Sequence, residues 1–152
     1  MTHFLIFDKD PSGAAAAEKI MLHTFVQCNA KVRVAQTKEE VWRLLQDRFS
    51  EFHVVFVSLS DVEDARAVAN AFRKGDLRTA LAFYGGDYAA LSKVMIFRPS
   101  AHVPEHISEQ GKSYFKRVVL ALYSEREREI DCFAVKRDCD IVKVRYKPAF
   151  FY

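Results

Sequence analysis

Charged side chains follow the first apolar run of the sequence, and a hydroxyl closes the third. Asp8, Lys9 and Asp10 come directly after HFLIF, and Ser58 ends HVVFVS. Carboxylates grouped in this way could bind Mg²⁺, which prefers anionic oxygen ligands. However, Lys9 stands between the two aspartates, and Ser58 carries no charge. The pattern is therefore consistent with a metal and phosphoryl site, or with a site that has lost this chemistry.

The composition is that of one folded domain rather than of a disordered regulator. Half of the 152 residues are hydrophobic and 13 are phenylalanine, enough to fill a core, while a net charge of +3 says little about partners. The cysteines Cys28, Cys132 and Cys139 form no CxxC pair, so we expect reduced thiols. No run approaches the roughly 20 apolar residues of a membrane span, and the N-terminus lacks a signal-peptide layout. We therefore expect a cytoplasmic protein with no membrane association.

Apolar runs typical of buried strands alternate with helical patterns along the chain. Two capping boxes, Thr37 with Glu40 and Ser60 with Glu63, mark the starts of the second and third helices. Right-handed helical crossovers join parallel strands, so this order predicts an α/β fold, a doubly wound five-stranded parallel sheet of the flavodoxin-like (βα)5 type. We expect strands at 3–7, 31–36, 53–58, 79–84 and 94–97, and helices at 12–28, 38–49, 61–74, a short one through Leu91, and 106–129.

In such a sheet ligands bind outside the carboxyl ends of the strands. The residues expected there are Asp8, Lys9, Asp10, Ser58, Gly85 and Arg98. A serine hydroxyl is a poor nucleophile without a base, and no histidine is placed by sequence to activate Ser58. We expect its hydroxyl to be satisfied by local hydrogen bonds.

The pattern changes after residue 130. The segment CFAVKRDCDIVKVRYKPAFFY indicates two short strands, 132–137 and 140–146, around the turn RDCD. Two short strands cannot form a domain of their own. We therefore expect a first domain at 1–130 and a short C-terminal β-hairpin tail at 131–152, which either packs on that domain or begins another.

The segments FLIFDKDP, VVFVSLS, ALAFYGG and MIFRPS resemble the strand ends of response-regulator receiver domains. The tail FAVKRDCDIVKVRYKPAFFY resembles the first strands of a LytTR-type DNA-binding domain. Together these resemblances imply a bacterial transcriptional regulator whose receiver domain would be phosphorylated at the carboxyl edge of the sheet.

Position by position, the resemblance implies that most of the receiver machinery is replaced. Asp8 matches one of two acidic residues, Lys9 replaces the other, and Ser58 takes the place of the phosphoryl-accepting aspartate. The remaining equivalents are Gly85 for the hydroxyl residue after strand four, Arg98 for the lysine that closes strand five, and Met95 for the aromatic switch residue. We therefore expect a degenerate receiver that is neither an enzyme nor switched by aspartyl phosphorylation.

Electrostatics support this expectation. With Lys9 beside Asp8, the local charge is near zero, and an ammonium takes the place of the metal, so we expect no tight Mg²⁺ site and no other cofactor. Arg98 could clamp Asp8 as a built-in latch. Alternatively, Lys9, Arg98 and the backbone of Gly85 and Gly86 could bind a small anion.

The resemblance also implies how the domain would act. We expect a homodimer or a partner protein to bind the face formed by the fourth helix, fifth strand and fifth helix. DNA binding is expected only if a complete LytTR-type domain follows, with phosphate contacts from Lys136, Arg137, Lys143, Arg145 and Lys147. Two alternatives remain open: a phosphoryl-accepting receiver that uses a displaced aspartate, Asp61 or Asp64, or a small-ligand module of flavodoxin-like shape.

Overall fold

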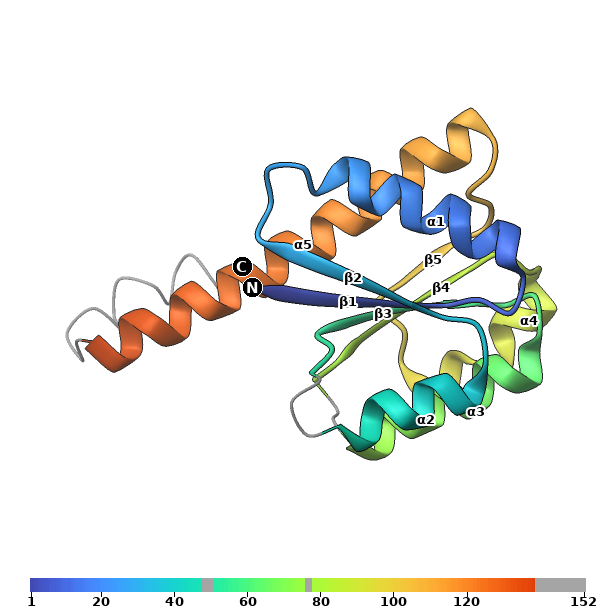
Figure 1. Ribbon diagram of the computed structural model, residues 1–152, viewed down its shortest axis with the longest axis horizontal. Coiled ribbons are helices and arrows are strands. Elements are labelled where there is room, and N and C mark those ends of the chain that lie inside the picture. The colour runs from blue at the N-terminus through green and yellow to red at the C-terminus, as the bar shows by residue number, and fades with distance from the viewer. Residues whose placement is uncertain (48–50, 76–77, 139–152) are drawn as a thin grey trace.

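The computed structural model describes residues 1–47, 51–75 and 78–138, with side chains up to residue 129. Its sheet has five parallel strands in the order β2-β1-β3-β4-β5, so the predicted doubly wound parallel sheet is confirmed (Figure 1). The elements are β1 (Thr2–Phe7), α1 (Pro11–Thr24), β2 (Ala30–Ala35), α2 (Lys38–Gln46), β3 (Val54–Ser58), α3 (Val62–Gly75), β4 (Ala80–Tyr84), α4 (Tyr88–Ser92), the 3₁₀-helix η1 (Met95–Phe97), β5 (Ala101–Val103) and α5 (Glu109–Asp138).

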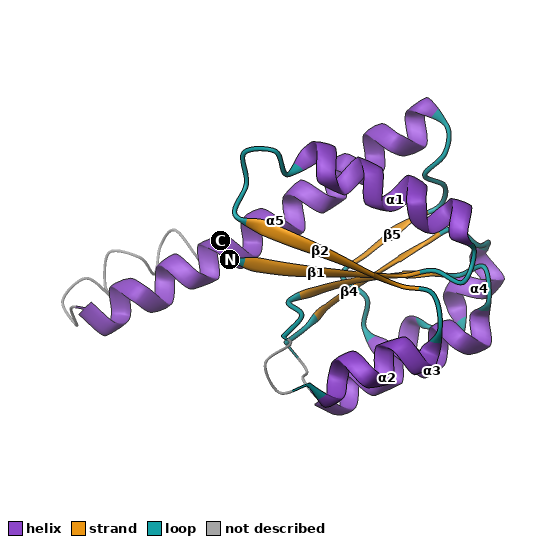
Figure 2. Ribbon diagram, in the orientation of Figure 1, coloured by secondary structure: helices purple, strands orange, loops and turns teal. Residues whose placement is uncertain are grey.

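Helices cover both faces of the sheet. Helices α1 and α5 pack on one face, while α2, α3 and the α4–η1 segment pack on the other (Figure 2). Because successive strand residues point to opposite faces, Phe4 and Ile6 of β1 join the core under α1 and α5, whereas Leu5 and Phe7 join the core under α2 and α3. This two-sided burial explains why the central strands are almost wholly apolar.

The helix starts follow the predicted capping in one case and not in the other. The Thr37 hydroxyl accepts a hydrogen bond from the Glu40 amide at 3.1 Å, as predicted for α2. At α3 the predicted Ser60 cap is wrong, because the Asp61 carboxylate accepts from the Asp64 amide at 3.1 Å. The helix therefore begins one residue later than the Ser60–Glu63 pattern indicates, and the Ser60 hydroxyl is left for another partner.

The predicted fifth strand at 94–97 is wrong. That segment contains η1, where Met95 and Ile96 are 53% and 77% exposed, and the strand that pairs with β4 is Ala101–Val103. The run VMIF has the composition of a buried strand, but the turn that follows it has Arg98 at a φ of 55°. Strand five is therefore shorter and more polar in sequence than the apolar run that precedes it.

The predicted strand at 132–137 is also wrong, because α5 extends from Glu109 to Asp138. No glycine or proline interrupts the sequence from 112 to 138, so nothing in the local chain ends the helix before that point. The predicted strand at 140–146 lies outside the described residues. Within the described part of the chain, no helix is long and apolar enough to cross a membrane.

A partly buried histidine, His53, holds the start of the sheet at its amino edge. The His3 amide donates to Nδ1 of His53 at 2.9 Å, so that nitrogen carries no proton in the fold. Burial and the nearby Arg126 guanidinium lower the pKa of His53, against the weaker opposing effect of Glu51, whose Oε1 lies 3.7 Å from Nε2. The fold therefore favours the neutral form of this imidazole.

The unfolding free energy should therefore decrease as the pH is lowered, because His53 becomes protonated. Because the folded pKa lies below the ordinary histidine value of 6.5, the stabilising contribution is present above that pH and is lost as pH falls through the lowered folded pKa. Denaturant unfolding at about pH 7.5 and about pH 5.5 checks this. The loss of unfolding free energy between the two should be larger for the unaltered protein than for His53→Asn, whose amide oxygen can still accept from His3. The variant His23→Asn at an exposed site should behave like the unaltered protein. Equal losses in all three proteins would contradict the assignment.

Candidate functional site

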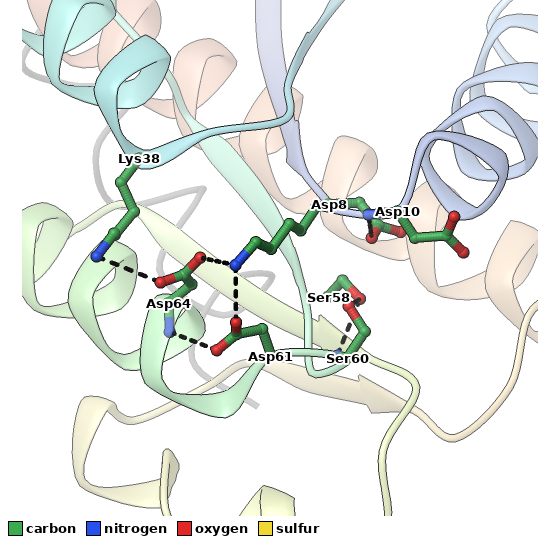
Figure 3. A network of polar contacts seen from close by, with 8 residues as sticks. Asp8, Asp10, Lys38, Ser58, Ser60, Asp61 and Asp64 are labelled. Carbon is green, nitrogen blue, oxygen red and sulfur yellow. Dashed lines mark hydrogen bonds and ion pairs between the residues drawn. The ribbon is translucent and has the colours of Figure 1, made fainter.

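The candidate site lies at the carboxyl edge of the sheet, as predicted. Asp8 follows β1, while Ser58 closes β3 and is paired in register with Tyr84, the last residue of β4. Figure 3 shows the polar side chains at this edge, from the β1–α1 loop across to the start of α3. Three elements that are far apart in sequence therefore meet around Asp8.

The carboxylate of Asp8 is held inside the protein by one hydroxyl and one backbone amide. Tyr84 Oη donates to Asp8 Oδ2 at 2.7 Å, and the Asp10 amide donates to Asp8 Oδ1 at 2.9 Å. Asp8 is 2% exposed and Tyr84 is fully buried. Burial, and then the Asp8 charge, raise the pKa of Tyr84 far above its ordinary value, so the phenol stays protonated and donates.

Tyr84 is the functional residue that sequence reasoning missed. It reads as the last apolar residue of ALAFY, and its ring does pack in the core against His106 and Phe115, with centroids 4.7 and 5.8 Å away. One feature of the sequence could have identified it. Tyr84 is an aromatic residue with a hydroxyl at the end of a strand, at the same edge of the sheet as Asp8. A buried tyrosine hydroxyl usually needs a partner, and Asp8 is the nearest one that topology supplies.

The first turn of α1 closes the pocket around Asp8. A Cβ atom on Gly13 would lie only 2.5 Å from Asp8 Oδ2, so only glycine leaves room for this carboxylate. Nε2 of His106 lies 3.2 Å from the Gly13 carbonyl oxygen and ties the loop before α5 to the same turn. Asp10 accepts a hydrogen bond from the Ser12 amide at 3.2 Å and caps α1.

Lys9 does not lie beside the Asp8 carboxylate, so that prediction is wrong. Its Nζ is 3.1 Å from Asp61 Oδ2 and 3.4 Å from Asp64 Oδ2, and Lys38 Nζ is 3.3 Å from Asp64 Oδ1 (Figure 3). Adjacent residues in an extended chain point in opposite directions, which places Asp8 inside and Lys9 outside. The hydrogen bonds to Asp61 and then Asp64 raise the pKa of Lys9, and the Asp64 amide and then Lys9 lower the pKa of Asp61. Both members of this exposed pair are therefore charged.

Ser58 satisfies its hydroxyl locally, as predicted. It is 6% exposed, its Oγ donates to Ser60 Oγ at 3.1 Å, and it accepts from the Ser60 amide at 3.2 Å. Ser58 is therefore a buried neutral hydroxyl in a turn, bonded to the hydroxyl and the amide of Ser60.

Gly85 and Gly86 form a tight turn at this edge. Their φ angles of 75° and 73° are left-handed, and a Cβ on Gly86 would lie 2.8 Å from Leu59 Cβ. The Gly85 amide donates to the Val103 carbonyl at 2.9 Å, and His102 Nε2 lies 3.1 Å from the Gly85 carbonyl oxygen. These contacts join the Gly85–Gly86 turn to β5.

Arg98 and Met95 do not belong to this site, so both switch assignments are wrong. The Arg73 guanidinium donates to the Phe97 carbonyl at 2.7 Å and to the Arg98 carbonyl at 3.1 Å, and also to Thr79, which precedes β4. This places the Met95–Arg98 turn at the amino ends of the strands, whereas Asp8 lies at their carboxyl ends. The proposed latch and the proposed anion site of Lys9, Gly86 and Arg98 therefore do not form. The residue that closes β5 is the buried Val103.

The carboxylates at this edge are held by hydrogen bonds from the protein itself. Among the residues that the structure describes, no three His, Cys, Asp or Glu side chains are grouped so that they could hold a metal. The carboxylate of Asp8 is committed to Tyr84 and a backbone amide, and Asp10 caps a helix. Mg²⁺ prefers carboxylate oxygens, and each of these carboxylates already accepts a hydrogen bond from the protein.

The basic residues proposed to contact DNA are only partly described. Lys136 and Arg137 lie in the last turns of α5, where the backbone is helical rather than extended. Lys143, Arg145 and Lys147 lie outside the described residues, so their role stays a prediction.

The fold is that of response-regulator receiver domains. The chain is similar to a receiver domain from Methanospirillum hungatei (TM-score 0.65, 13% identity, 85% of this chain and 98% of that chain). It is also similar to the receiver domain of a DNA-binding response regulator from Colwellia psychrerythraea (0.67, 14%, 82% and 99%) and to a putative pilus assembly protein from Burkholderia thailandensis (0.63, 11%, 82% and 99%). No protein-family model matches the sequence, and neither does any curated protein. At such low identities the likeness establishes the fold alone.

The contributions of Asp8 and Tyr84 to the unfolding free energy should be strongly coupled. Tyr84→Phe leaves a buried carboxylate oxygen unsatisfied and should lower the unfolding free energy by about 1–3 kcal/mol. In a double-mutant cycle with Asp8→Ala, denaturant unfolding should give a coupling of about 1 kcal/mol or more. Tyr88→Phe is the matched control, because Tyr88 is 87% exposed, and it should have almost no effect. Additive losses in the cycle would show that the two side chains do not depend on each other.

The Lys9 ion pair should be visible in the titration of Asp61. Lys9→Met should raise the pKa of Asp61, as followed by side-chain carboxyl NMR, because the variant loses the Lys9 hydrogen bond and charge, both of which lower that pKa. The matched control is Lys38→Met, which removes a partner of Asp64 only and should move the Asp61 pKa less. The difference between the variants should shrink in high salt, since the pair is exposed. An Asp61 pKa that is unchanged in Lys9→Met would refute the pairing.

Proposed function

We propose that this chain contains a receiver-like domain of a bacterial transcriptional regulator that works without aspartyl phosphorylation. In this proposal the domain is not an enzyme, binds no Mg²⁺ tightly and acts through contacts with a second copy or a partner protein. The observation that carries it is the hydrogen bond from Tyr84 to Asp8 at 2.7 Å, because a protein hydroxyl holds the carboxylate that would otherwise serve a metal.

The absence of an acceptor carboxylate at position 58 supports the same proposal. Ser58 is buried, and its hydroxyl is already bonded to Ser60. The nearby acids are also engaged, since Asp61 caps α3 and both Asp61 and Asp64 pair with Lys9. A displaced aspartate would have to break these contacts before it accepted a phosphoryl group.

Exposed apolar side chains support a role in protein contacts. Tyr88 on α4 is 87% exposed, and Met95 and Ile96 on η1 are 53% and 77% exposed. On α5, Tyr114 is 41% exposed and lies under the Arg117 guanidinium, whose Cζ is 5.6 Å from the ring centroid. Exposed apolar side chains on α4, η1 and α5 suit a protein interface. For the transcriptional role the support is the LytTR-like composition of the tail, where Lys143, Arg145 and Lys147 offer positive charge to DNA phosphates.

A phosphodonor experiment tests the proposal. The full chain is incubated with Mg²⁺ and acetyl phosphate, and separately with Mg²⁺ and beryllofluoride, and is followed by intact mass and by amide NMR spectra. We expect no phosphoryl adduct and no shifts at 8–10, 58–64 or 84–86. An adduct on Asp61 or Asp64, located by peptide mapping, would support the displaced-aspartate alternative and overturn ours.

Two gain-of-function variants test whether Tyr84 prevents Mg²⁺ from binding at Asp8. Ser58→Asp alone restores an acceptor but leaves Asp8 bonded to Tyr84, so it should still bind Mg²⁺ weakly. Ser58→Asp combined with Tyr84→Phe frees Asp8 and should bind Mg²⁺ at least about tenfold more tightly by calorimetry. Equal affinities in the two variants would mean that Tyr84 does not control this pocket.

A further inference from the structure

A hollow lies between α1 and α5, apart from the site around Asp8. Its volume is about 670 Å³, within the range of small-molecule sites. We call it the α1–α5 groove. Its lining residues are Ala16, Lys19, Ile20, His23 and Thr24 of α1, Ile107 from the loop before α5, and Glu109, Lys112, Ser113 and Lys116 of α5.

Both apolar and cationic side chains line the groove. Ala16 and Ser113 are small, while Ile20 and Ile107 supply apolar surface, and Ile107 is 62% exposed, which is unfavourable for an isoleucine without a partner. Lysine stems add further apolar surface while their ammonium groups remain in water.

The charge at the groove is positive. Lys19, Lys112 and Lys116 stand against a single carboxylate, Glu109, which gives 3 − 1 = +2 before His23 is counted. Glu109 is already engaged, because its Oε1 lies 3.6 Å from Lys112 Nζ. An anionic group placed between the two helices would therefore meet the positive charge of Lys19 and Lys116.

Charge also excludes two other occupants. The tail of this chain is basic, with Lys143, Arg145 and Lys147, so like charges oppose its entry. A second copy related by a two-fold axis would present the same lysines to each other.

Size favours a small molecule over a protein segment. The groove is lined by the ten residues named above, whereas a stable protein interface uses about 20–30 residues on each side. Along α1 it runs only from Ala16 to Thr24, about 12 Å at 1.5 Å per residue. That length matches an extended chain of about ten carbon atoms.

We propose that the α1–α5 groove binds a single-chain amphiphilic anion, a medium-chain carboxylate or alkyl phosphate. The chain lies over Ala16, Ile20 and Ile107, and the anionic head group contacts Lys19, Lys112 and Lys116. Such a ligand joins α1 to α5, the helix that continues to Asp138, and stabilises their contact by mass action. This site is separate from the Asp8 pocket and does not depend on the proposed function.

Dodecanoate is the probe, used below its micelle concentration with the full chain. Calorimetry should show saturable 1:1 binding, and amide NMR shifts should be confined to 16–24 and 107–116. Dodecyltrimethylammonium, of equal chain length and opposite charge, should bind at least about tenfold more weakly. Binding of dodecanoate should weaken in high salt.

Three variants locate the site. Lys19→Glu combined with Lys116→Glu should weaken dodecanoate binding at least about tenfold. Ser113→Trp, at an exposed position, should fill the groove and abolish binding, and Ala16→Trp should do the same from the α1 side. Lys74→Glu on α3 is exposed on the opposite face and serves as the matched control, with unchanged affinity. Circular dichroism and thermal unfolding establish that each variant is folded.

Several outcomes would overturn the proposal. These are no saturable binding of dodecanoate, equal affinity for the cationic detergent, shifts outside the two helices, or full binding by folded Ser113→Trp. Binding to phosphatidylglycerol vesicles without binding of free dodecanoate would identify a membrane surface instead. Binding of a glutamate-rich helical peptide without dodecanoate would identify a protein partner, and self-association lost in the double lysine variant would identify a second copy.

Discussion

The structure of this domain depends on how it keeps one carboxylate buried. Asp8 is 2% exposed, and a charge in that position is tolerated only when hydrogen bonds replace water. Tyr84 and the Asp10 amide supply those bonds, which connect β1 to β4 and to the loop that starts α1. The same requirement explains Gly13, where any side chain would collide with the carboxylate.

A second connection crosses the same edge on the solvent side. Lys9 joins the loop after β1 to the start of α3 through Asp61 and Asp64. Because this pair is exposed, water screens it, and its main effect is to orient the two loops rather than to stabilise the fold. The protein thus uses its own side chains, one buried pair and one exposed network, to hold the loops at the carboxyl edge of the sheet together.

The fold and the chemistry of this protein are separable. Chains that share only 13–14% identity with it have the same sheet and helices, because the fold needs apolar residues at buried positions rather than particular ones. Chemistry at the carboxyl edge, in contrast, depends on a few side chains placed at the ends of the strands. The α1–α5 groove is a feature of another kind, since it depends on side-chain size and charge between two helices.

The sequence by itself determined the first four strands, the helices between them and the edge where Asp8 and Ser58 meet. These follow from local periodicity and capping, which each segment carries in its own residues. It did not determine strand five, because Ala101–Val103 is too short to show a period and the apolar run before it is a better strand by composition. It also failed at 132–137, where alternation suggested a strand but the helix begun at Glu109 continued. Only the tertiary structure decided that Tyr84 reaches Asp8, that Lys9 turns to Asp61 and that Arg98 lies at the opposite edge. Those contacts join residues up to 76 positions apart, and periodicity records which side of a segment is buried but not which distant partner it meets.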